Sequence, residues 1–455
     1  MKYLLIHLLL IIIVSLGLSC SRSDNPVVKP VSSGNTSPIL LSHPNVILIV
    51  GDDIGYEIPT CNGGQSYSTP ALDHLAANGM RFTQCYSSPL CAPSRIALLT
   101  GKYNFRNYYA WGVLNKNQLT LGNLFRDNFY QTYYAGKWQL DGGDASIKKF
   151  GFQNYIVWKP FNVSQSKSGS RYKGPKLYTN GKYISSSLLK DKYGEDIFVD
   201  SIESFISKTR LSPFFVYYAV TLAHKPFSPT PDDPDFAWWP NGNISKSDKK
   251  YFPGMIKYMD KKIGELMDYL KKKNIDKNTI VIYIGDNGTP TEITSQFNGM
   301  SVTGGKGHTN TYGTHVPLIV YWKGRIPAGT VNDNLVSFPD FLPTLANLTQ
   351  MYTPLSFKPI DGISFANQLF GDYSTARSFI YNYYHRDTSF APVTWVQDTK
   401  FKLYDSTKNI YHQPGFYNMQ YDIKEKNPLP YSSLKSSQKI TEQMFAHALD
   451  SINKK

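Results

Sequence analysis

Cysteine is scarce in this chain. Four of its 455 residues are Cys, at positions 20, 61, 85 and 91. So few cysteines exclude a scaffold held together by many disulfides, and 455 residues can bury a large core without them. Cys61 and Cys85 either pair in an oxidising compartment or remain free thiols, and the sequence leaves both alternatives open.

The chain also lacks a concentrated patch of positive charge. Lysine and arginine number 48 against 34 acidic residues, which gives a formal charge of +14. Because no clustered Lys/Arg arm and no nucleic-acid motif accompanies this charge, we expect no nucleic-acid partner. The excess of positive charge fits an anionic substrate instead.

The N-terminal segment has the pattern of an export signal. Lys2 precedes an apolar run from Tyr3 to Leu18, and small residues follow it. This run is short for a membrane-spanning helix, so we predict a signal peptide over residues 1–19. The protein is therefore expected outside the cytoplasm.

Cys20 stands where a bacterial lipoprotein signal places its lipidated cysteine. This position predicts a periplasmic or outer-membrane lipoprotein that meets the membrane only through a lipid anchor. The alternative is plain secretion after cleavage near Ser19. Residues 20–43, which lack helical or strand periodicity, are expected to be a flexible tether.

Strand and helix patterns alternate through most of the chain and indicate an α/β fold. Continuous apolar runs, typical of strands buried on both faces, occupy residues 45–50, 213–220, 279–284 and 316–322. A helix is predicted from Pro70 to Gly79, between a starting proline and a terminating glycine. A longer helix carries one apolar stripe from Met255 to Leu270.

The pattern changes beyond residue 375. Short hairpin-like strands are predicted at 378–382, 393–396 and 401–404, followed by an amphipathic helix at 440–452. We therefore expect a catalytic α/β domain over residues 44–374 and a small antiparallel subdomain over 375–455.

Two acidic pairs follow predicted buried strands. Asp52 and Asp53 end the first run, and Asp286 and Asn287 end the third. Ligands usually bind at the carboxyl edge of such a sheet. Four hard oxygen donors brought together there suit Ca²⁺ or Mg²⁺.

The segment Cys91-Ala92-Pro93-Ser94-Arg95 points to anion chemistry. Pro93 is expected at the first position of a helix, so the residue just before it lies at the helix N-terminus, where free backbone N–H groups favour an anion. Arg95, one turn further on, can stabilise an oxyanion by charge-assisted hydrogen bonds.

Together with the following Ile96–Lys102, this segment resembles the signature of the formylglycine-dependent sulfatases. The resemblance extends over most of the chain, through the segments 69–76, 135–138, 223–226 and 304–307. It implies an alkaline-phosphatase-like fold, with a large central mixed sheet flanked by helices. It also implies a nucleophile made from Cys91 by a formylglycine-generating maturation enzyme.

The resemblance further assigns roles to residues. It implies a bound Ca²⁺, with Mg²⁺ the weaker alternative, held by Asp52, Asp53, Asp286, Asn287 and an oxygen of the modified Cys91. Arg95, Lys137 and Lys306 would neutralise the sulfate oxygens. His224, assisted by Lys306, would protonate the departing oxygen of the substrate.

One position departs from the family. Gln139 stands where these enzymes usually have a histidine that accepts a proton when sulfate is released. Glutamine forms hydrogen bonds but cannot act as a base near neutral pH. His308, two residues after Lys306, is a candidate substitute.

The substrate is expected to be a sulfated glycan. Candidate contacts to its hydroxyl groups are Arg106, His385 and Arg386, and an exposed tryptophan in the segment 236–240 could stack on a sugar ring. Two further hypotheses remain: a phosphodiester, phosphonate or phosphate hydrolase of the same superfamily, and a non-catalytic glycan-binding relative. A shortage of histidines in the metal region disfavours a two-zinc site.

Overall fold

The computed structural model describes residues 43–161, 168–209, 212–386, 391–405 and 414–454. The predicted signal peptide, Cys20 and nearly all of the predicted tether lie outside these residues and stay predictions. Within the described ranges, no helix is long and apolar enough to cross a membrane.

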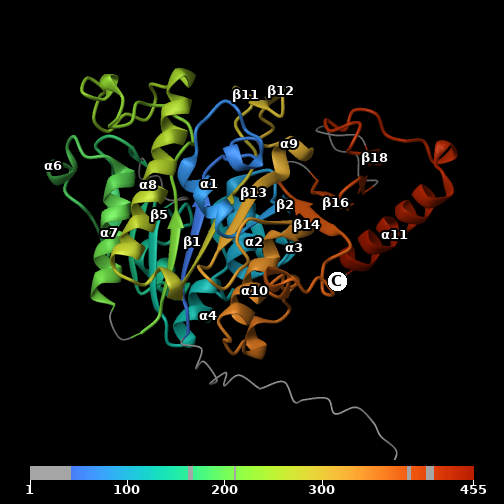
Figure 1. Cartoon of the computed structure of the whole chain (residues 1–455), viewed down its shortest axis with the longest axis horizontal. Helices are drawn as coiled ribbons and strands as arrows, with labels where there is room; N and C mark the ends of the chain where they lie inside the picture. Colours follow the sequence, from blue (N-terminus) through green and yellow to red (C-terminus); the bar gives the residue numbers. More distant parts are fainter. Residues whose placement is uncertain (1–42, 162–167, 210–211, 387–390, 406–413, 455) are drawn as a thin grey trace, which may run out of the picture. The chain divides into compact units, whose positions relative to one another are not determined.

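A ten-stranded mixed sheet organises the chain (Figure 1), and its strands follow the order β14-β2-β13-β10-β1-β9-β5-β6-β7-β8. The strands are β1 Asn45–Gly51, β2 Met80–Tyr86, β5 Gln131–Lys137, β6 Asn154–Trp158, β7 Leu177–Thr179, β8 Lys182–Tyr183, β9 Phe214–Ala219, β10 Thr279–Gly285, β13 His315–Tyr321 and β14 Thr330–Ser337. The five central strands β10, β1, β9, β5 and β6 run parallel. Strands β13, β2 and β7 supply the antiparallel pairings. The predicted mixed α/β sheet is thus confirmed.

Helices cover both faces of this sheet (Figure 1). The helices are α1 Pro70–Ala77, α2 Cys91–Thr100, α3 Asn104–Asn107, α4 Leu121–Asp127, α5 Gly143–Lys149, α6 Ser186–Leu189, α7 Gly194–Lys208, α8 Phe252–Lys272, α9 Thr311–Thr314, α10 Phe341–Leu348 and α11 Ser436–Asn453. Apolar residues of α2, α4 and α10 pack on one face, and those of α1, α7 and α8 on the other.

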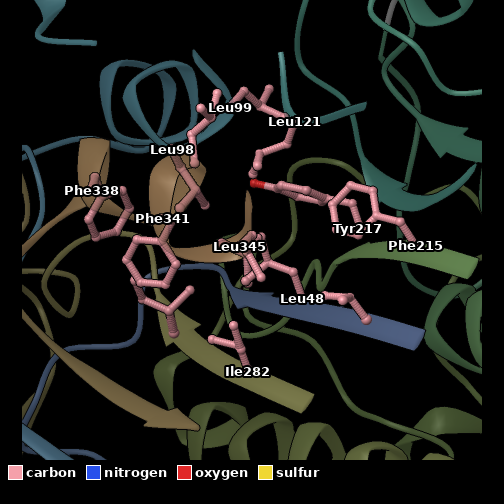
Figure 2. Packing of buried hydrophobic residues seen from close by; sticks show 14 of the residues in the cluster. Leu48, Leu98, Leu99, Leu121, Phe215, Tyr217, Ile282, Phe338, Phe341 and Leu345 are labelled. Carbon is pink, nitrogen blue, oxygen red and sulfur yellow. The ribbon is translucent and has the colours of Figure 1, made fainter. Parts of the chain in front are cut away.

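The central strand β1 shows why the apolar runs are continuous. Val46, Leu48 and Val50 enter one apolar core, while Ile47 and Ile49 enter the other. Because successive side chains of a strand point to opposite faces, a strand covered on both sides needs no polar positions. Figure 2 shows Leu48 with Phe215 and Ile282 from the neighbouring strands, packed against Leu98, Leu99 and Leu345.

The C-terminal antiparallel sheet is also confirmed. It has four strands, β15 Ile380–Tyr384, β16 Val393–Gln397, β17 Phe401–Tyr404 and β18 Phe416–Asn418, and α11 packs against it. Only β18 was not predicted. The described residues form one compact unit, so the domain boundary at residue 375 stays a prediction. Cys61 and Cys85 are free thiols, which decides between the two alternatives left open by the sequence.

Two small two-stranded sheets complete the fold. They pair β3 Tyr108–Ala110 with β4 Val113–Leu114, and β11 Thr294–Phe297 with β12 Met300–Thr303. The second hairpin leads directly into the loop that carries Lys306.

Candidate active site

The parallel strands deliver charged residues to one edge of the sheet. Gly51 is level with Gly285, and Val50 with Ala219, so the residues that follow β1, β10 and β9 emerge side by side. Gly136, the partner of Ala219, brings Lys137 to the same edge. A side chain at position 136 would bring its Cβ to 1.9 Å from the Ala219 carbonyl oxygen, so this close approach requires glycine.

Four buried polar residues form the floor of the site. Asn287 Nδ2 donates a hydrogen bond of 2.8 Å to Asp53 Oδ1. The Asp53 backbone N–H donates to Asp286 Oδ1 at 3.0 Å. Asp52 lies on the adjoining side, and its carboxylate, like those of Asp53 and Asp286, is shielded from solvent. The two predicted acidic pairs therefore meet, as their positions at strand ends indicated.

Helix α2 begins at Cys91, two residues before the predicted start at Pro93. Proline is tolerated there because backbone N–H groups in the first helical turn have no partner within the helix. Ser94 Oγ contributes to the local geometry by hydrogen bonding to the carbonyl oxygens of Leu90 at 2.8 Å and Ser88 at 3.0 Å. Cys91 is itself the first residue of the helix, at the N-terminus that favours an anion.

Three cations pair with the three carboxylates. Lys137 Nζ donates to both oxygens of Asp52, at 2.7 and 2.8 Å. Lys306 Nζ lies 2.5 Å from Asp53 Oδ2, and Arg95 Nε lies 2.8 Å from Asp286 Oδ2. Burying a charge is tolerable when it has an opposite charge and hydrogen bonds, and each carboxylate here has both.

His224 reaches the same cluster from the segment that follows β9. Its Nε2 lies 3.9 Å from Asp53 Oδ2, and its Nδ1 lies 2.6 Å from the carbonyl oxygen of Lys225. The Tyr172 hydroxyl donates to the carbonyl oxygens of Thr221 and His224, which fixes this segment against its neighbour.

The surroundings change the acidity of these groups. Burial alone would raise the pKa of Asp52, but nearby positive charges, that of Lys137 foremost, hold it below its ordinary value. Burial raises the pKa of Asp286 to about 6 in spite of Arg95. Burial, reinforced by repulsion from Lys306, lowers the pKa of His224 to about 3. The His224 imidazole is therefore neutral at neutral pH, and its bond to a carbonyl oxygen places the proton on Nδ1.

The donor set fits a hard cation. Asn287 Oδ1 is buried and accepts no hydrogen bond from any described residue. Ligand atoms of Asp52, Cys91 and Asp286 lie within 4.8 Å of one another, as do those of Asp52, Asp53 and His224. A buried acceptor without a donor is costly unless something else satisfies it, and carboxylate and amide oxygens are the ligands that Ca²⁺ and Mg²⁺ prefer.

Gln139 lies beside the predicted nucleophile. The Cys91 thiol donates to Gln139 Oε1 at 3.4 Å, and burial foremost raises the pKa of that thiol. The residue that departs from the family pattern is therefore in direct contact with position 91. It also lines a cavity of about 350 Å³ together with Lys137 and His224.

The remaining predicted site residues lie elsewhere. His308 is exposed, with Nδ1 3.2 Å from the Gly305 carbonyl oxygen, and Arg106 forms an ion pair of 3.1 Å with Asp361. His385 follows β15 with its ring near that of Tyr383, and Arg386 is exposed next to it. Contact between substrate and these four residues stays a prediction.

Two tryptophans in the segment 236–240 differ in their surroundings. Trp239 is buried against Tyr251, whereas Trp238 is 89% exposed. Trp238 is thus available for stacking on a sugar, and that role also stays a prediction.

Sequence reasoning missed two cations at the site. Lys159 and Arg171 line the same cavity as Gln139 and His224. Neither belongs to a motif, and only the pairing of β5 with β6 brings Lys159 close. The strand β6 that Lys159 follows was not predicted either, so the sequence offered no signal for these two cations.

The sheet, its helices and the polar edge define an alkaline-phosphatase-like hydrolase fold. The family model described as Sulfatase matches residues 44–351, so the chain belongs to the sulfatase family. It is a sulfuric ester hydrolase, which decides among the three hypotheses left by the sequence.

The chain is also similar to individual proteins, in sequence or in fold. N-acetylgalactosamine-6-sulfatase of Canis lupus familiaris is 29% identical over 379 residues, covering 76% of this chain and 70% of the relative. The solved structure of Ps i-CgsB in complex with k-i-k-neocarrahexaose has a TM-score of 0.74 at 25% identity, covering 90% and 92% of the two chains. Phosphonate monoester hydrolase of Agrobacterium radiobacter shares the fold alone, with a TM-score of 0.63 at 18% identity and coverage of 90% and 95%.

The Lys137–Asp52 pair yields a stability prediction. Lys137→Met leaves the buried Asp52 carboxylate without its nearest counter-charge, and we expect the free energy of unfolding of the metal-free protein to fall by about 3–5 kcal/mol. The measurement is urea denaturation in the presence of a chelator. The matched control is Lys148→Met, which removes an exposed pair with Asp144 and should cost at most about 0.5 kcal/mol. Equal losses in the two variants would contradict the account.

Proposed function

We propose that this sulfatase hydrolyses sulfate esters of carbohydrates, with a formylglycine made from Cys91 as the nucleophile and with Ca²⁺ bound beside it. The observation that carries the proposal is the position of Cys91. It starts helix α2 at the point where Asp52 and Asp286 converge, within reach of Lys137 and Gln139.

Formylglycine at position 91 would supply a hydrated aldehyde whose hydroxyl group attacks sulfur. An unmodified thiol is poorly suited to this role, because burial raises its pKa and keeps it protonated. Cys91 is only 1% exposed. We therefore expect the maturation enzyme to act before the chain has folded around this residue.

Asp52, Asp53, Asp286 and Asn287, with an oxygen at position 91, would hold the metal ion. When bound, Ca²⁺ would supply positive charge beside the reacting oxygens. The buried Asn287 Oδ1, which no described residue satisfies, supports this donor set. Ca²⁺ is favoured over Mg²⁺ because it accepts the irregular, all-protein oxygen sites that Mg²⁺ tends to avoid.

The cations of the site are placed to bind the sulfate group. Arg95 donates through Nε to Asp286. Its buried Nη1 and Nη2 atoms form no hydrogen bond with any described residue, and Nη2 lies 3.8 Å from Asp52 Oδ1. These two atoms can donate to sulfate oxygens without first giving up another bond. Lys137 and Lys306 add charge that is already fixed in place, which is how preorganised sites stabilise developing negative charge.

His224 is proposed to protonate the departing oxygen. Its Nδ1 is assigned the proton because it lies 2.6 Å from the Lys225 carbonyl oxygen, and its Nε2 lies 3.9 Å from Asp53 Oδ2. An acid role therefore requires uptake of a second proton at Nε2, and the negative charge of a bound sulfate ester favours that uptake.

A sugar substrate is supported by what the relatives act on or bind. One is named for a sulfated N-acetylgalactosamine, and a solved structure holds a neocarrahexaose. The cavity of about 350 Å³ beside Cys91 falls in the range of small-molecule sites. The exposed Trp238 offers a surface on which a sugar ring could stack.

Removal of the nucleophile tests the proposal directly. In protein produced together with a maturation enzyme, we expect Cys91→Ala to lower sulfate release from sulfated sugars and aryl sulfates by at least about a thousandfold. Cys61→Ala, which removes a free thiol outside the site, should keep the activity. Substantial sulfate release by Cys91→Ala would refute the assigned nucleophile.

The metal site can be tested without turnover. Calorimetric titration of chelator-treated protein with Ca²⁺ should give one tight site, and Asn287→Leu should weaken it by about tenfold or more because one oxygen ligand is lost. Asn347→Leu, an exposed position, serves as the control. The metal assignment fails if Asn287→Leu binds Ca²⁺ as tightly as the unaltered protein.

Gln139 limits proton transfer in this account. Gln139→His places an imidazole beside position 91, where it can accept a proton, so kcat should rise. The variant should also be more active above than below a pH of about 6.5, since only the neutral ring is a base. Gln139→Asn, which adds no base, controls for altered packing. An unchanged kcat in Gln139→His would show that another group already performs this step.

A further inference from the structure

The cavity beside Cys91 carries positive charge that the hydrolysis of a single sulfate ester does not use. Lys137, Lys159 and Arg171 line it, and no described lining residue is acidic. Lys137 is neutralised by Asp52, and Lys306 and Arg95 have carboxylates of their own. Lys159 and Arg171 form no ion pair with any described carboxylate.

Arg171 is held firmly, yet part of its hydrogen-bonding capacity is unused. Its guanidinium group lies 4.1 Å from the centroid of the Trp158 ring, and Nη2 donates to the Lys225 carbonyl oxygen at 2.7 Å. The side chain is more than nine-tenths buried, and Nη1 finds no acceptor among the described residues. A buried guanidinium with a free donor is the arrangement that binds a planar or tetrahedral anion well.

Lys159 approaches the same space from the neighbouring strand end. The backbone N–H of Trp138 donates to the backbone carbonyl oxygen of Trp158 at 3.1 Å. The backbone N–H of Gln139 donates to the carbonyl oxygen of Lys159 at 3.2 Å. The two segments therefore run side by side, and Gln139 connects Lys159 to the thiol of Cys91. Lys159 Nζ lies 5.9 Å from the centroid of the Trp158 ring, so both cations are close to the same indole.

Two residues that line this cavity share an uncommon backbone conformation. Gln139 and Lys159 both have left-handed conformations, with φ of 57° and 56°. Non-glycine residues in this region are uncommon and carry an energetic cost, and they gather at functional sites. Both residues line the same cavity.

From these contacts we propose that Lys159 and Arg171 bind a second anionic group of the substrate, a sulfate ester or a carboxylate on the same or the adjoining sugar. This inference rests on the proposed function, because it takes the reactive sulfate to lie at Cys91. The preferred substrates are then polyanionic sugars. A neutral sugar with one sulfate would leave two largely buried cations without a counter-charge.

Equilibrium binding to the Cys91→Ala variant of the full chain tests this inference independently of turnover. The probes are the 6-sulfates of N-acetylglucosamine and N-acetylgalactosamine, each compared with a partner that carries a second sulfate and with a disaccharide that adds a uronic acid. We expect at least one doubly charged probe to bind about tenfold or more tightly than its singly charged partner by calorimetry. Comparing the probes with a second sulfate against those with a uronic acid identifies which anion is preferred.

Further substitutions in the Cys91→Ala variant show which residues cause the preference for doubly charged probes. Arg171→Gln and Lys159→Gln should each reduce the preference severalfold, and Arg171→Lys should retain part of it because the charge remains but the fork of donors is lost. Lys257→Gln, an equal change of charge on the exposed side of α8, should leave it unchanged. Circular dichroism verifies that each variant is folded.

Equal affinity for singly and doubly charged probes, absence of binding by all probes, or a preference that survives both Arg171→Gln and Lys159→Gln would overturn the inference. Failure of the proposed function gives a different result. In that case the protein with Cys91 intact releases no sulfate from any ester, whatever the binding data show.

Discussion

The pairing of buried carboxylates with cations at the carboxyl edge of the sheet is the constraint on which the site depends. Asp52, Asp53 and Asp286 are removed from water, and each would be costly alone. Lys137, Lys306 and Arg95 come from three separate segments to neutralise them. The strands and loops that carry these cations are thereby fixed to the edge, so the same charges that stabilise the folded site also organise it for an anionic substrate.

The fold meets this constraint by the register of its parallel strands. Strands β10, β1, β9 and β5 end at nearly the same level, and the residues that follow them have no further sheet partner. Helix α2 then brings Cys91 to the cluster with its N-terminal N–H groups pointing the same way. The apolar cores on both faces hold these elements rigidly, while the edge itself remains polar.

Much of this arrangement could be predicted from the sequence. The apolar runs identified β1, β9, β10 and β13 because strands buried on both faces leave a continuous pattern. The acidic pairs were found because they stand at strand ends, and Cys91 was found because its segment resembles the sulfatase signature. The contribution of Lys159 and Arg171 could not be found, because it arises from the pairing of β5 with β6 and from the packing of Arg171 on Trp158. The start of α2 was misplaced by two residues, since proline is allowed anywhere in the first turn.

The central claim is that the residue at position 91 is chemically altered in the working enzyme. Mass spectrometry of the tryptic peptide that contains this position, isolated from protein made in its native host, tests it most directly. The account predicts a peptide that carries an aldehyde in place of the Cys91 thiol. A peptide with an intact cysteine, recovered from protein that releases sulfate, would contradict it.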